Sequence, residues 1–572
     1  MDLARPTPAA WLRRPLAQGL LLCAVTAAAY AGCLRAGFVF DDFALVVYSR
    51  DTLGLAHPLH FFTQDLWALA DGGGASGYYR PLMGLSLAVD RALFGLAPAG
   101  YHLHSLAWHL LAVFALHRLL LRLAKPLPAL LGAALFALHP LQSEAVLWIA
   151  ARNDAMAAAL LLTALGLLEP PDPGRRRLAL AALAALGAVL SKESALLMPL
   201  FLLLLDLGRF GRLRGWTRHA VLWGAVGVHV ALRGLAGVNA AAAPSALGWH
   251  VLRWKALPVL ATIGDLLAWP WPLSVGRDLE SLAIAPVPLV LGLCVCALLP
   301  LLLLLPRGGR RLALTGLGWA ALGAAPSVLA LADKALFGER YLYLSMAGLG
   351  LAVAAATGAW AARAPAKSAL LLALAVPWSL LIHTRTPDWR DDISLWQAAL
   401  RDTPSGFVAA SLGHVLNRAG RKEEALALFE IALDSTPPHP EVCPKIATLA
   451  QETGDLPRAA GIVEVAAAHG CDDDVFGGQR AALLATTGRW AEAERVALAH
   501  EADRHGRARI VLAAAALVRG DCARYRALLE AFARPEELDV QMERTLQLGG
   551  HPDVSAALRA GALCGELGGA GR

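Results

Sequence analysis

The amino-acid sequence predicts an all-α protein in two parts, a polytopic transmembrane helical domain followed by an α-solenoid. Only 17% of the 572 residues are charged and 57% are hydrophobic, whereas about a quarter of a soluble globular chain is charged. Residues 16–383 hold repeated apolar runs, and a hydrocarbon core of about 30 Å is crossed by such a run as a helix. From Thr386 onward charges return, and small residues recur every 34 positions.

The apolar runs of residues 1–385 predict about eleven crossings, separated by six basic clusters that we expect to be cytoplasmic. The runs are 16–34, 101–121, 127–147, 153–169, 178–191, 194–207, 219–235, 284–305, 312–331, 341–360 and 368–383. The clusters are Arg5/Arg13/Arg14, Arg118/Arg122/Lys125, Arg175/Arg176/Arg177, Arg209/Arg212/Arg214/Arg218, Arg307/Arg310/Arg311 and Arg363/Lys367. An odd number of crossings that starts inside ends outside. The sequence therefore predicts a multi-pass protein of a bacterial inner membrane, with residues 386–572 in the periplasm.

Two apolar segments allow more than one interpretation. Residues 16–34 resemble a signal peptide, but many further runs follow, so we expect an uncleaved first helix. Residues 251–275 carry Lys255, Asp265 and two prolines. We treat this segment as a re-entrant or interface-lying helix, because a full crossing would break the parity of the basic loops.

This topology places most of the unusual ionisable residues on the outer side. The long first outer loop, residues 35–100, contains Asp41, Asp42 and Arg80. The shorter outer turns contain His139, Glu144, Arg152, Asp154, Lys192, Glu193, Glu339 and Arg340, with Tyr341 next to the last. Ionisable groups at a membrane edge are costly and usually line a cavity. The sequence therefore predicts an active site at the outer membrane face.

The charge and cysteine patterns exclude two other classes of protein. The net charge of +6 comes from short basic clusters between apolar runs, which suits cytoplasmic loops better than a nucleic-acid-binding face. No cysteine spacing is typical of a zinc site, and Cys294 and Cys296 lie inside an apolar run as packing residues.

Residues 386–572 show a helical repeat. Gly420, Gly454 and Gly488 are 34 residues apart, and a fourth unit, two residues shorter, centres on Gly520. Small and apolar residues at matching positions predict tetratricopeptide (TPR) repeats at about 406–439, 440–473, 474–505 and 506–540. Such a solenoid offers a concave groove in which an acceptor or a partner protein could dock, and the alternative is a spacer that binds nothing.

The four cysteines of this second part leave two interpretations open. They are Cys443, Cys471, Cys522 and Cys564. Outside the cytoplasm they could form disulfides. Small buried thiols in tight helix packing fit the sequence equally well.

Several short motifs occur in order along the chain. They are Phe38-Val39-Phe40-Asp41-Asp42, Tyr79-Arg80-Pro81-Leu82, Gly100-Tyr101-His102, His139-Pro140 with Glu144-Ala145, Arg152-Asn153-Asp154, Ser191-Lys192-Glu193 and Glu339-Arg340-Tyr341-Leu342-Tyr343-Leu344. These motifs resemble the TMTC family of membrane O-mannosyltransferases, which belong to the GT-C class of glycosyltransferases and carry TPR repeats. Asn153 departs from the small residue that is commoner in the family. The resemblance implies a GT-C-like membrane domain, a polyprenyl-phosphate-linked sugar donor and a hydroxyl acceptor on protein.

Sugar transfer to a hydroxyl needs a base and groups that hold the leaving phosphate. We expect Asp41 or Asp42 to be the base, and the resemblance implies the same. Arg80, Arg152, Lys192 and Arg340 are candidate phosphate ligands, although they could instead snorkel or pair with Glu144, Asp154, Glu193 and Glu339. His139 could bind substrate, cap a helix or position Glu144.

The remaining predictions concern cofactors, partners and competing functions. We expect no cofactor and no metal, although Asp42, Glu144 and Asp154 could in principle hold a divalent ion. The expected partners are the lipid-linked sugar donor, a protein or lipid hydroxyl acceptor and membrane lipid, with no nucleic acid. The alternatives are a transporter or flippase for lipid-linked sugars, and a non-catalytic TPR envelope scaffold. The sequence leaves open the sugar, the acceptor and the oligomeric state.

Overall fold

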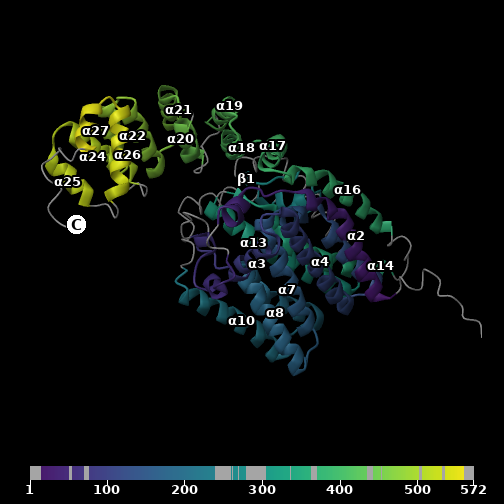
Figure 1. The fold of residues 1–572 in the computed structure, drawn as a ribbon. Helices are drawn as coiled ribbons and strands as arrows, with labels where there is room; N and C mark the ends of the chain where they lie inside the picture. The colour runs from purple at the N-terminus through teal and green to yellow at the C-terminus, as the bar shows by residue number, and fades with distance from the viewer. Residues whose placement is uncertain are drawn as a thin grey trace, which may run out of the picture. The chain divides into compact units, whose positions relative to one another are not determined.

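The computed structural model describes residues 14–49, 54–69, 76–238, 259–260, 262–267, 269–278, 305–334, 336–361, 370–433, 442–452, 454–501, 506–530 and 535–559. The chain folds into two compact units, Met1–Asp402 and Thr403–Arg572. Figure 1 traces both units, and each is built of helices, as the sequence predicts.

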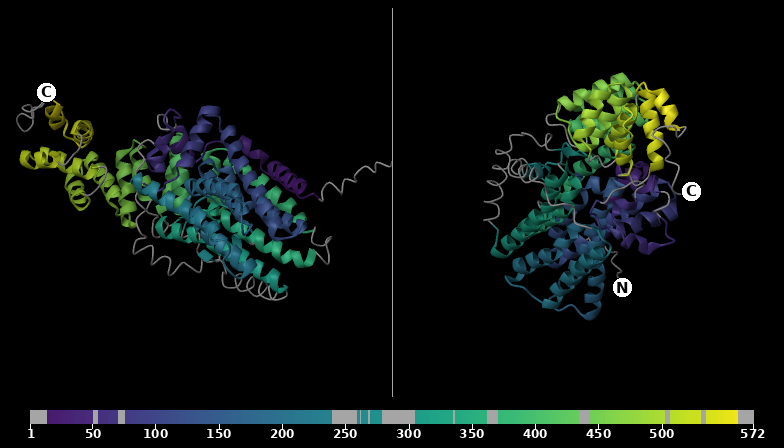
Figure 2. Two further views of the ribbon diagram at one scale, coloured as in Figure 1. Left: turned by 90° about the horizontal axis from the view of Figure 1, so that it is seen from below. Right: turned by 90° about the vertical axis from the view of Figure 1, so that its left-hand side faces the viewer.

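The described part of the first unit is a bundle of helices (Figure 2). Its α-helices are α2 (Pro15–Tyr30), α3 (Pro81–Phe94), α4 (Pro98–Leu123), α5 (Pro126–Leu138), α6 (Ser143–Leu147), α7 (Arg152–Leu168), α8 (Arg175–Ser191), α9 (Met198–Phe210), α10 (Trp216–Leu235), α13 (Arg307–Lys334), α14 (Tyr343–Ala361), α16 (Ala375–Arg385) and α17 (Asp392–Asp402). The only strands of the described residues are β1 (Arg277–Asp278) and β2 (Leu336–Phe337), which pair antiparallel.

Single 3-10 or π turns break the bundle at its connections. They are η1 (Ala31–Arg35), η2 (Phe43–Val47), η3 (Pro58–Phe62), η4 (Leu66–Leu69), η5 (Pro140–Gln142), η6 (Ile149–Ala151), η7 (Glu193–Leu197), η8 (Glu339–Leu342), η9 (Leu370–Leu374) and η10 (Thr386–Trp389). Several of the motifs singled out in the sequence lie in or beside these turns.

Four described helices are long and apolar enough to cross a membrane: Pro15–Arg35, Pro98–Leu123, Ile149–Leu168 and Glu339–Gly358. A fifth crossing is possible if Pro126–Leu138 and Pro140–Leu147, bent by 49°, form one broken span. These five match predicted runs, which confirms a multi-pass membrane protein. The predicted run 284–305 lies almost entirely outside the described residues, and so do residues 251–258, 261 and 268 of the segment 251–275. The total of eleven crossings stays a prediction.

Glycines allow the bundle helices to approach closely. α14 packs against α13 and α5, and α7 packs against α4 and α8. A Cβ atom on Gly348 would lie 2.5 Å from the backbone nitrogen of Ala320, and one on Gly350 would lie 2.6 Å from the carbonyl oxygen of Gly132. Helix association in lipid depends on van der Waals contact between small residues. These glycines therefore bring α5, α13 and α14 into direct backbone contact.

The first unit extends beyond residue 385 because its last helix binds the loop after α2. The backbone N–H of Gly37 donates to the carbonyl of Trp389 (3.2 Å), and that of Phe40 donates to Asp392 Oδ1 (2.6 Å). The ring of Phe40 also packs edge-on against Trp396 at 5.1 Å between centroids. α17 thus belongs to the membrane unit by its contacts.

The second unit consists of helices that follow one another in pairs. They are α18 (Gly406–Arg418), α19 (Lys422–Leu433), α20 (Val442–Glu452), α21 (Leu456–Ala468), α22 (Asp474–Thr486), α23 (Trp490–Ala499), α24 (Arg507–Val518), α25 (Cys522–Glu530), α26 (Pro535–Leu548) and α27 (Pro552–Arg559). Gly420, Gly454, Gly488 and Gly520 all have φ between 73° and 79° and lie in the turns within pairs. Left-handed backbone favours glycine, so the spacing of these residues has a conformational reason. Assignment to the TPR class stays a prediction.

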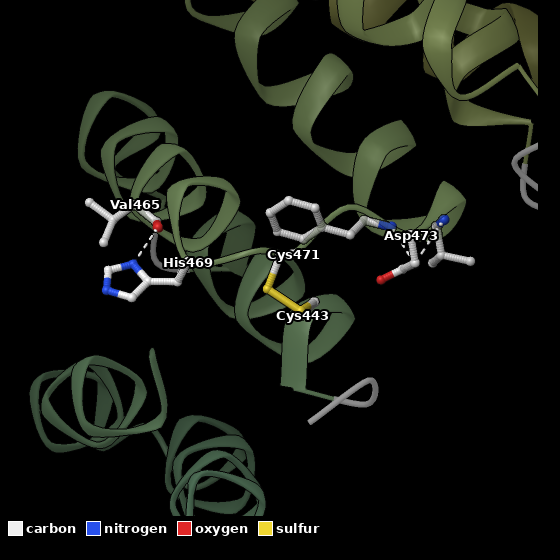
Figure 3. Close-up of a disulfide and its surroundings, with 7 residues drawn as sticks. Cys443, Val465, His469, Cys471 and Asp473 are labelled. Carbon is white, nitrogen blue, oxygen red and sulfur yellow. Dashed lines mark hydrogen bonds between the residues drawn. A yellow bond between two sulfur atoms is a disulfide. The ribbon is translucent and has the colours of Figure 1, made fainter. Parts of the chain in front are cut away.

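In the second unit, a disulfide connects α20 to the turn that follows α21. Cys443 on α20 bonds to Cys471, which follows α21, across a sequence separation of 28 (Figure 3). Both residues are buried. Cys522 is also disulfide-bonded. The sequence left open whether these cysteines form disulfides. In the structure Cys443, Cys471 and Cys522 do.

Candidate active site

The predicted site residues occupy breaks between helices at one end of the first unit. Asp41 and Asp42 follow α2, Glu144 lies on α6 between α5 and α7, Lys192 follows α8, and Arg340 lies between α13 and α14. A break leaves polar side chains at helix ends, where they reach neighbours on other helices. Three cation–carboxylate pairs result.

The first pair joins the start of α3 to the turn after α8. Arg80 Nε donates to Glu193 Oε2 (2.8 Å), and the Arg80 guanidinium lies 4.2 Å from the centre of the Tyr78 ring. Burial lowers the pKa of Arg80, but Glu193 outweighs it and leaves that pKa above its usual range. Burial raises the pKa of Glu193, but the positive charge of Arg80 outweighs this effect and leaves that pKa below its usual range. Both groups are therefore charged at neutral pH.

The second pair joins the same turn to α7. Lys192 Nζ donates to Asp154 Oδ2 (2.5 Å) and lies 5.1 Å from the centre of the Tyr341 ring. Burial lowers the pKa of Lys192 to about 8; Asp154 opposes this shift, and the positive charges of Arg80 and Arg340 add to it. Because Arg80 and Arg340 act on the ammonium group, the three cations lie within electrostatic reach of one another.

The third pair joins η8 to α6. Arg340 Nη1 donates to Glu144 Oε1 (2.5 Å), and the Arg340 backbone N–H donates to Glu144 Oε2 (2.9 Å). The guanidinium lies 4.6 Å from the ring centres of both Trp148 and Tyr341. A Cβ atom on Gly338 would lie 2.6 Å from Arg340 Nη1. Glycine at position 338 therefore leaves room for the guanidinium.

The two adjacent aspartates have different surroundings. Asp42 is fully buried, and its carboxylate accepts hydrogen bonds from the backbone of Val39 (3.1 Å) and Ala150 (2.8 Å). Asp41 is partly exposed. Phe40, the residue before Asp41, has a φ of 49°, a conformation that non-glycine residues rarely adopt.

Burial raises the pKa of Asp42 well above its usual range, the N–H groups of Val39 and Ala150 oppose the shift, and Asp41 adds to it. Asp42 thus anchors the loop to η6. Asp41 is the more exposed of the two carboxyl groups.

Aromatic rings connect this acidic pair to the cations. Phe40, next to Asp41, stacks on Trp148 with 5.5 Å between ring centroids. Trp148 is the same ring on which Arg340 lies. The acidic loop and the third cation therefore flank one indole, although they are about 300 residues apart in the sequence.

Three further predicted site residues make their contacts in the protein interior, outside the three cation–carboxylate pairs. Arg152 is fully buried and bonds to Asp90 (2.5 Å), Ser86, Ser105 and the carbonyl of Tyr101. His139 caps η5 through Leu141 N (3.4 Å) and packs on Trp378. Glu339 accepts from Ser274 N (2.6 Å) and pairs with Arg277 (3.3 Å) and Arg385 (3.0 Å). These residues position the turns of the site.

The sequence analysis did not identify Tyr78 and Trp148 as site residues. The guanidinium groups of Arg80 and Arg340 lie over their rings. The proximity of these two aromatic residues in the sequence to Arg80, Glu144 and Arg152 was the available clue. Within the described ranges, no three or more His, Cys, Asp or Glu side chains come together as a metal site would require.

Comparison with known proteins places this geometry in context. No protein-family model matches the chain. Protein O-mannosyl-transferase Tmtc1 of Drosophila melanogaster is 33% identical over 200 residues, which are 34% of this chain and 23% of that protein. The chain is similar to the TMTC proteins. This finding confirms the resemblance that the motifs indicate.

Two further TMTC relatives show the same extent of similarity. Drosophila Tmtc2 is 36% identical over 203 residues, which are 33% of this chain and 21% of that protein. Mouse TMTC2 is 34% identical over 155 residues, which are 26% of this chain and 18% of that protein. Both relatives are named protein O-mannosyl-transferases. The match spans only about a fifth of the length of these relatives.

Proposed function

We propose that this TMTC-like protein transfers a sugar from a polyprenyl-phosphate-linked donor to a hydroxyl acceptor on protein, at the extracytoplasmic membrane face. The grouping of three cations carries the proposal: Lys192 and Arg340 both lie against Tyr341, and Arg80 acts electrostatically on Lys192. Three cations from separate elements fit the phosphate of such a donor. The names of the relatives support sugar transfer to protein.

In the proposed reaction Asp41 removes the proton of the acceptor hydroxyl as its oxygen attacks the anomeric carbon. The bond between that carbon and the phosphate oxygen breaks, and the polyprenyl phosphate leaves with the bonding electron pair. Arg80, Lys192 and Arg340 stabilise the negative charge that develops on this phosphate. Asp42 holds the loop that presents Asp41, through its two backbone hydrogen bonds.

An apolar cavity in the bundle supports a lipid-linked donor. It has a volume of about 270 Å³ and is lined by α5, α14 and α16, including Leu131, Val353 and Trp378. Trp378 packs on His139 with 5.0 Å between ring centroids. His139 begins the turn that leads to Glu144, the partner of Arg340. A prenyl chain in this cavity would lie along α14 and α16, with Trp378 connecting it to His139 at the edge of the polar cluster.

The disulfide of the second unit supports the proposed location. Disulfides persist in oxidising compartments and are rare in the cytoplasm. We therefore assign Cys443 and Cys471, and with them the second unit, to the periplasm or an equivalent extracytoplasmic space. We further propose that the helical pairs of this unit bind the acceptor, as other helical solenoids bind peptides.

The first test compares Asp41→Asn with Asp42→Asn and a control, Asp391→Asn. Asp391 is partly exposed, pairs with its neighbour Arg390 (3.0 Å) and accepts a hydrogen bond from Ser394 N (2.8 Å), which asparagine can also accept. We expect Asp41→Asn to abolish glycosylation of envelope proteins, measured by mass spectrometry, with normal protein abundance. The control should keep both. Asp42→Asn should lower abundance, because the buried anchor is weakened.

The result also separates the competing functions. A flippase or a scaffold would tolerate Asp41→Asn and would change the envelope glycans only when the whole chain is deleted. Full glycosylation by the Asp41→Asn variant would therefore exclude the proposed base.

A further inference from the structure

A second charged site lies at the other end of the same helices. α9 begins after Lys192 and Glu193 and ends at Phe210, and α14 begins after η8 and ends at Ala361. α13 runs the opposite way, from Arg307 toward η8. The ends of these helices that lie away from the candidate active site surround two cavities.

The two cavities adjoin and have basic linings. One, of about 500 Å³, is lined by Arg122 and Lys125 at the end of α4. The other, of about 340 Å³, is lined by Arg209 of α9 and by Arg307 and Arg311 of α13. Leu123, Gly308 and Leu312 line both cavities. Five cationic side chains from three helix ends and a turn therefore line two neighbouring cavities, which together are called the basic cavity.

The positive charge of this space is only partly balanced. Glu169 pairs with Arg122 (3.4 Å) and with Arg209. Among the described residues, no carboxylate lies within ion-pair distance of Lys125, Arg307 or Arg311. The backbone N–H groups of Gly308 and Gly309 precede the first hydrogen bond of α13, which Arg310 donates to Pro306 (2.9 Å), and add further donors.

The rest of the lining is apolar, with Leu123, Leu312, Ala354 and Ala355 among its residues. A free inorganic anion would gain nothing from these groups, whereas a lipid places a charged headgroup and acyl chains side by side. Basic pockets between transmembrane helices bind anionic headgroups in this way. Scattered cytoplasmic arginines alone would satisfy the positive-inside rule without forming a cavity.

We propose that this basic cavity binds the phosphate of an anionic phospholipid headgroup in the leaflet opposite the candidate active site. Arg307 and Arg311 contact the phosphate, and Leu123 and Leu312 contact the first segments of the acyl chains. The site is separate from the sugar-transfer site, so this inference does not rest on the proposed function.

The test uses the purified full-length protein in detergent and native mass spectrometry with added phosphatidylglycerol or phosphatidylcholine. The wild type should retain phosphatidylglycerol preferentially. The double variant Arg307→Gln/Arg311→Gln should retain it more weakly by roughly 30-fold, since each of the two cations near a headgroup contributes roughly 1 kcal/mol. Arg310→Gln is the matched control, because Arg310 is on the same helix turn and lines neither cavity.

Two results would overturn the proposal. Equal retention of phosphatidylglycerol by the wild type, the double variant and the control would show that these arginines bind no headgroup. Equal displacement of the lipid by millimolar inorganic phosphate and by short-chain phosphatidylglycerol would assign the site to free phosphate instead. Thermal melting of all three proteins without lipid checks that the double variant is folded.

Discussion

At the scale of residues, the candidate site contains cations with two distinct roles. Arg80, Lys192 and Arg340 are each paired with one carboxylate beside an aromatic ring. Arg152 is instead enclosed by Asp90, two serine hydroxyls and a backbone carbonyl. The side chains of Arg80, Lys192 and Arg340 keep some exposed surface with which they can meet a ligand. The side chain of Arg152 has none, and it joins helices instead.

This distinction predicts opposite outcomes for Arg152→Gln and Arg80→Gln. Loss of Arg152 leaves the buried Asp90 with His104 (2.6 Å) as its remaining ion-pair partner among the described residues, and breaking a buried ion pair costs about 3–5 kcal/mol. We expect Arg152→Gln to unfold at markedly lower temperature in detergent. Arg80→Gln, whose side chain is 13% exposed, should melt near the wild type and lose sugar transfer. Normal melting of Arg152→Gln with selective loss of activity would return Arg152 to the phosphate site.

The lowered pKa of Lys192 predicts that donor binding depends on pH. Its pKa is lowered to about 8, chiefly by burial, so its positive charge is present below pH 8 and is lost as the pH rises through 8. Affinity for the phosphate-bearing donor should therefore fall between pH 7 and 9. In Lys192→Arg the guanidinium keeps its charge and the fall should vanish. Donor-binding assays across this range make the comparison, and an unchanged fall in the variant would assign it to another group.

The sequence predicted which residues gather but not how they pair. The turns that were predicted to lie outside all interrupt apolar runs, so their charged residues were expected at one membrane edge. The partner of each cation depends on contacts between residues far apart in sequence, such as Arg340 with Glu144 at a separation of 196. Neither apolar run length nor charge pattern contains that information.

At the scale of elements, glycine contacts determine how closely α14 approaches its neighbours. Gly350→Ala should destabilise the bundle, because its Cβ atom would lie 2.6 Å from the carbonyl oxygen of Gly132, a backbone atom that cannot rotate away. Overpacking of this kind costs about 1–3 kcal/mol. Thermal melting in detergent measures the effect. Gly358→Ala on the same helix is the control, since a Cβ atom there meets nothing within 4 Å. Equal melting of the two variants would contradict the expected helix contact.

Helix identity was easier to predict than helix boundaries. The runs 16–34, 101–121 and 341–360 correspond to Pro15–Arg35, Pro98–Leu123 and Glu339–Gly358. The run 127–147 proved to be two helices bent by 49° around His139 and Pro140. Proline restricts the residue before it and ends helices, so the break has a local cause that hydropathy does not register.

At the scale of the whole molecule, the topology can be tested by reporter fusions. Alkaline phosphatase needs an oxidising compartment for its disulfides, so a fusion after residue 572 should be active. A fusion after Arg212, in a basic cluster predicted to be cytoplasmic, should be inactive. Activity only in the second fusion would invert the orientation proposed for the chain.

Each cation of the candidate site has a carboxylate partner, so these paired groups have little net charge. A stray anion that entered would have to part Arg80, Lys192 or Arg340 from its carboxylate without other compensation. The donor brings a long hydrocarbon tail, whose burial can offset that separation. Selectivity for a tethered phosphate over a dissolved one would then arise from self-neutralisation of the resting protein.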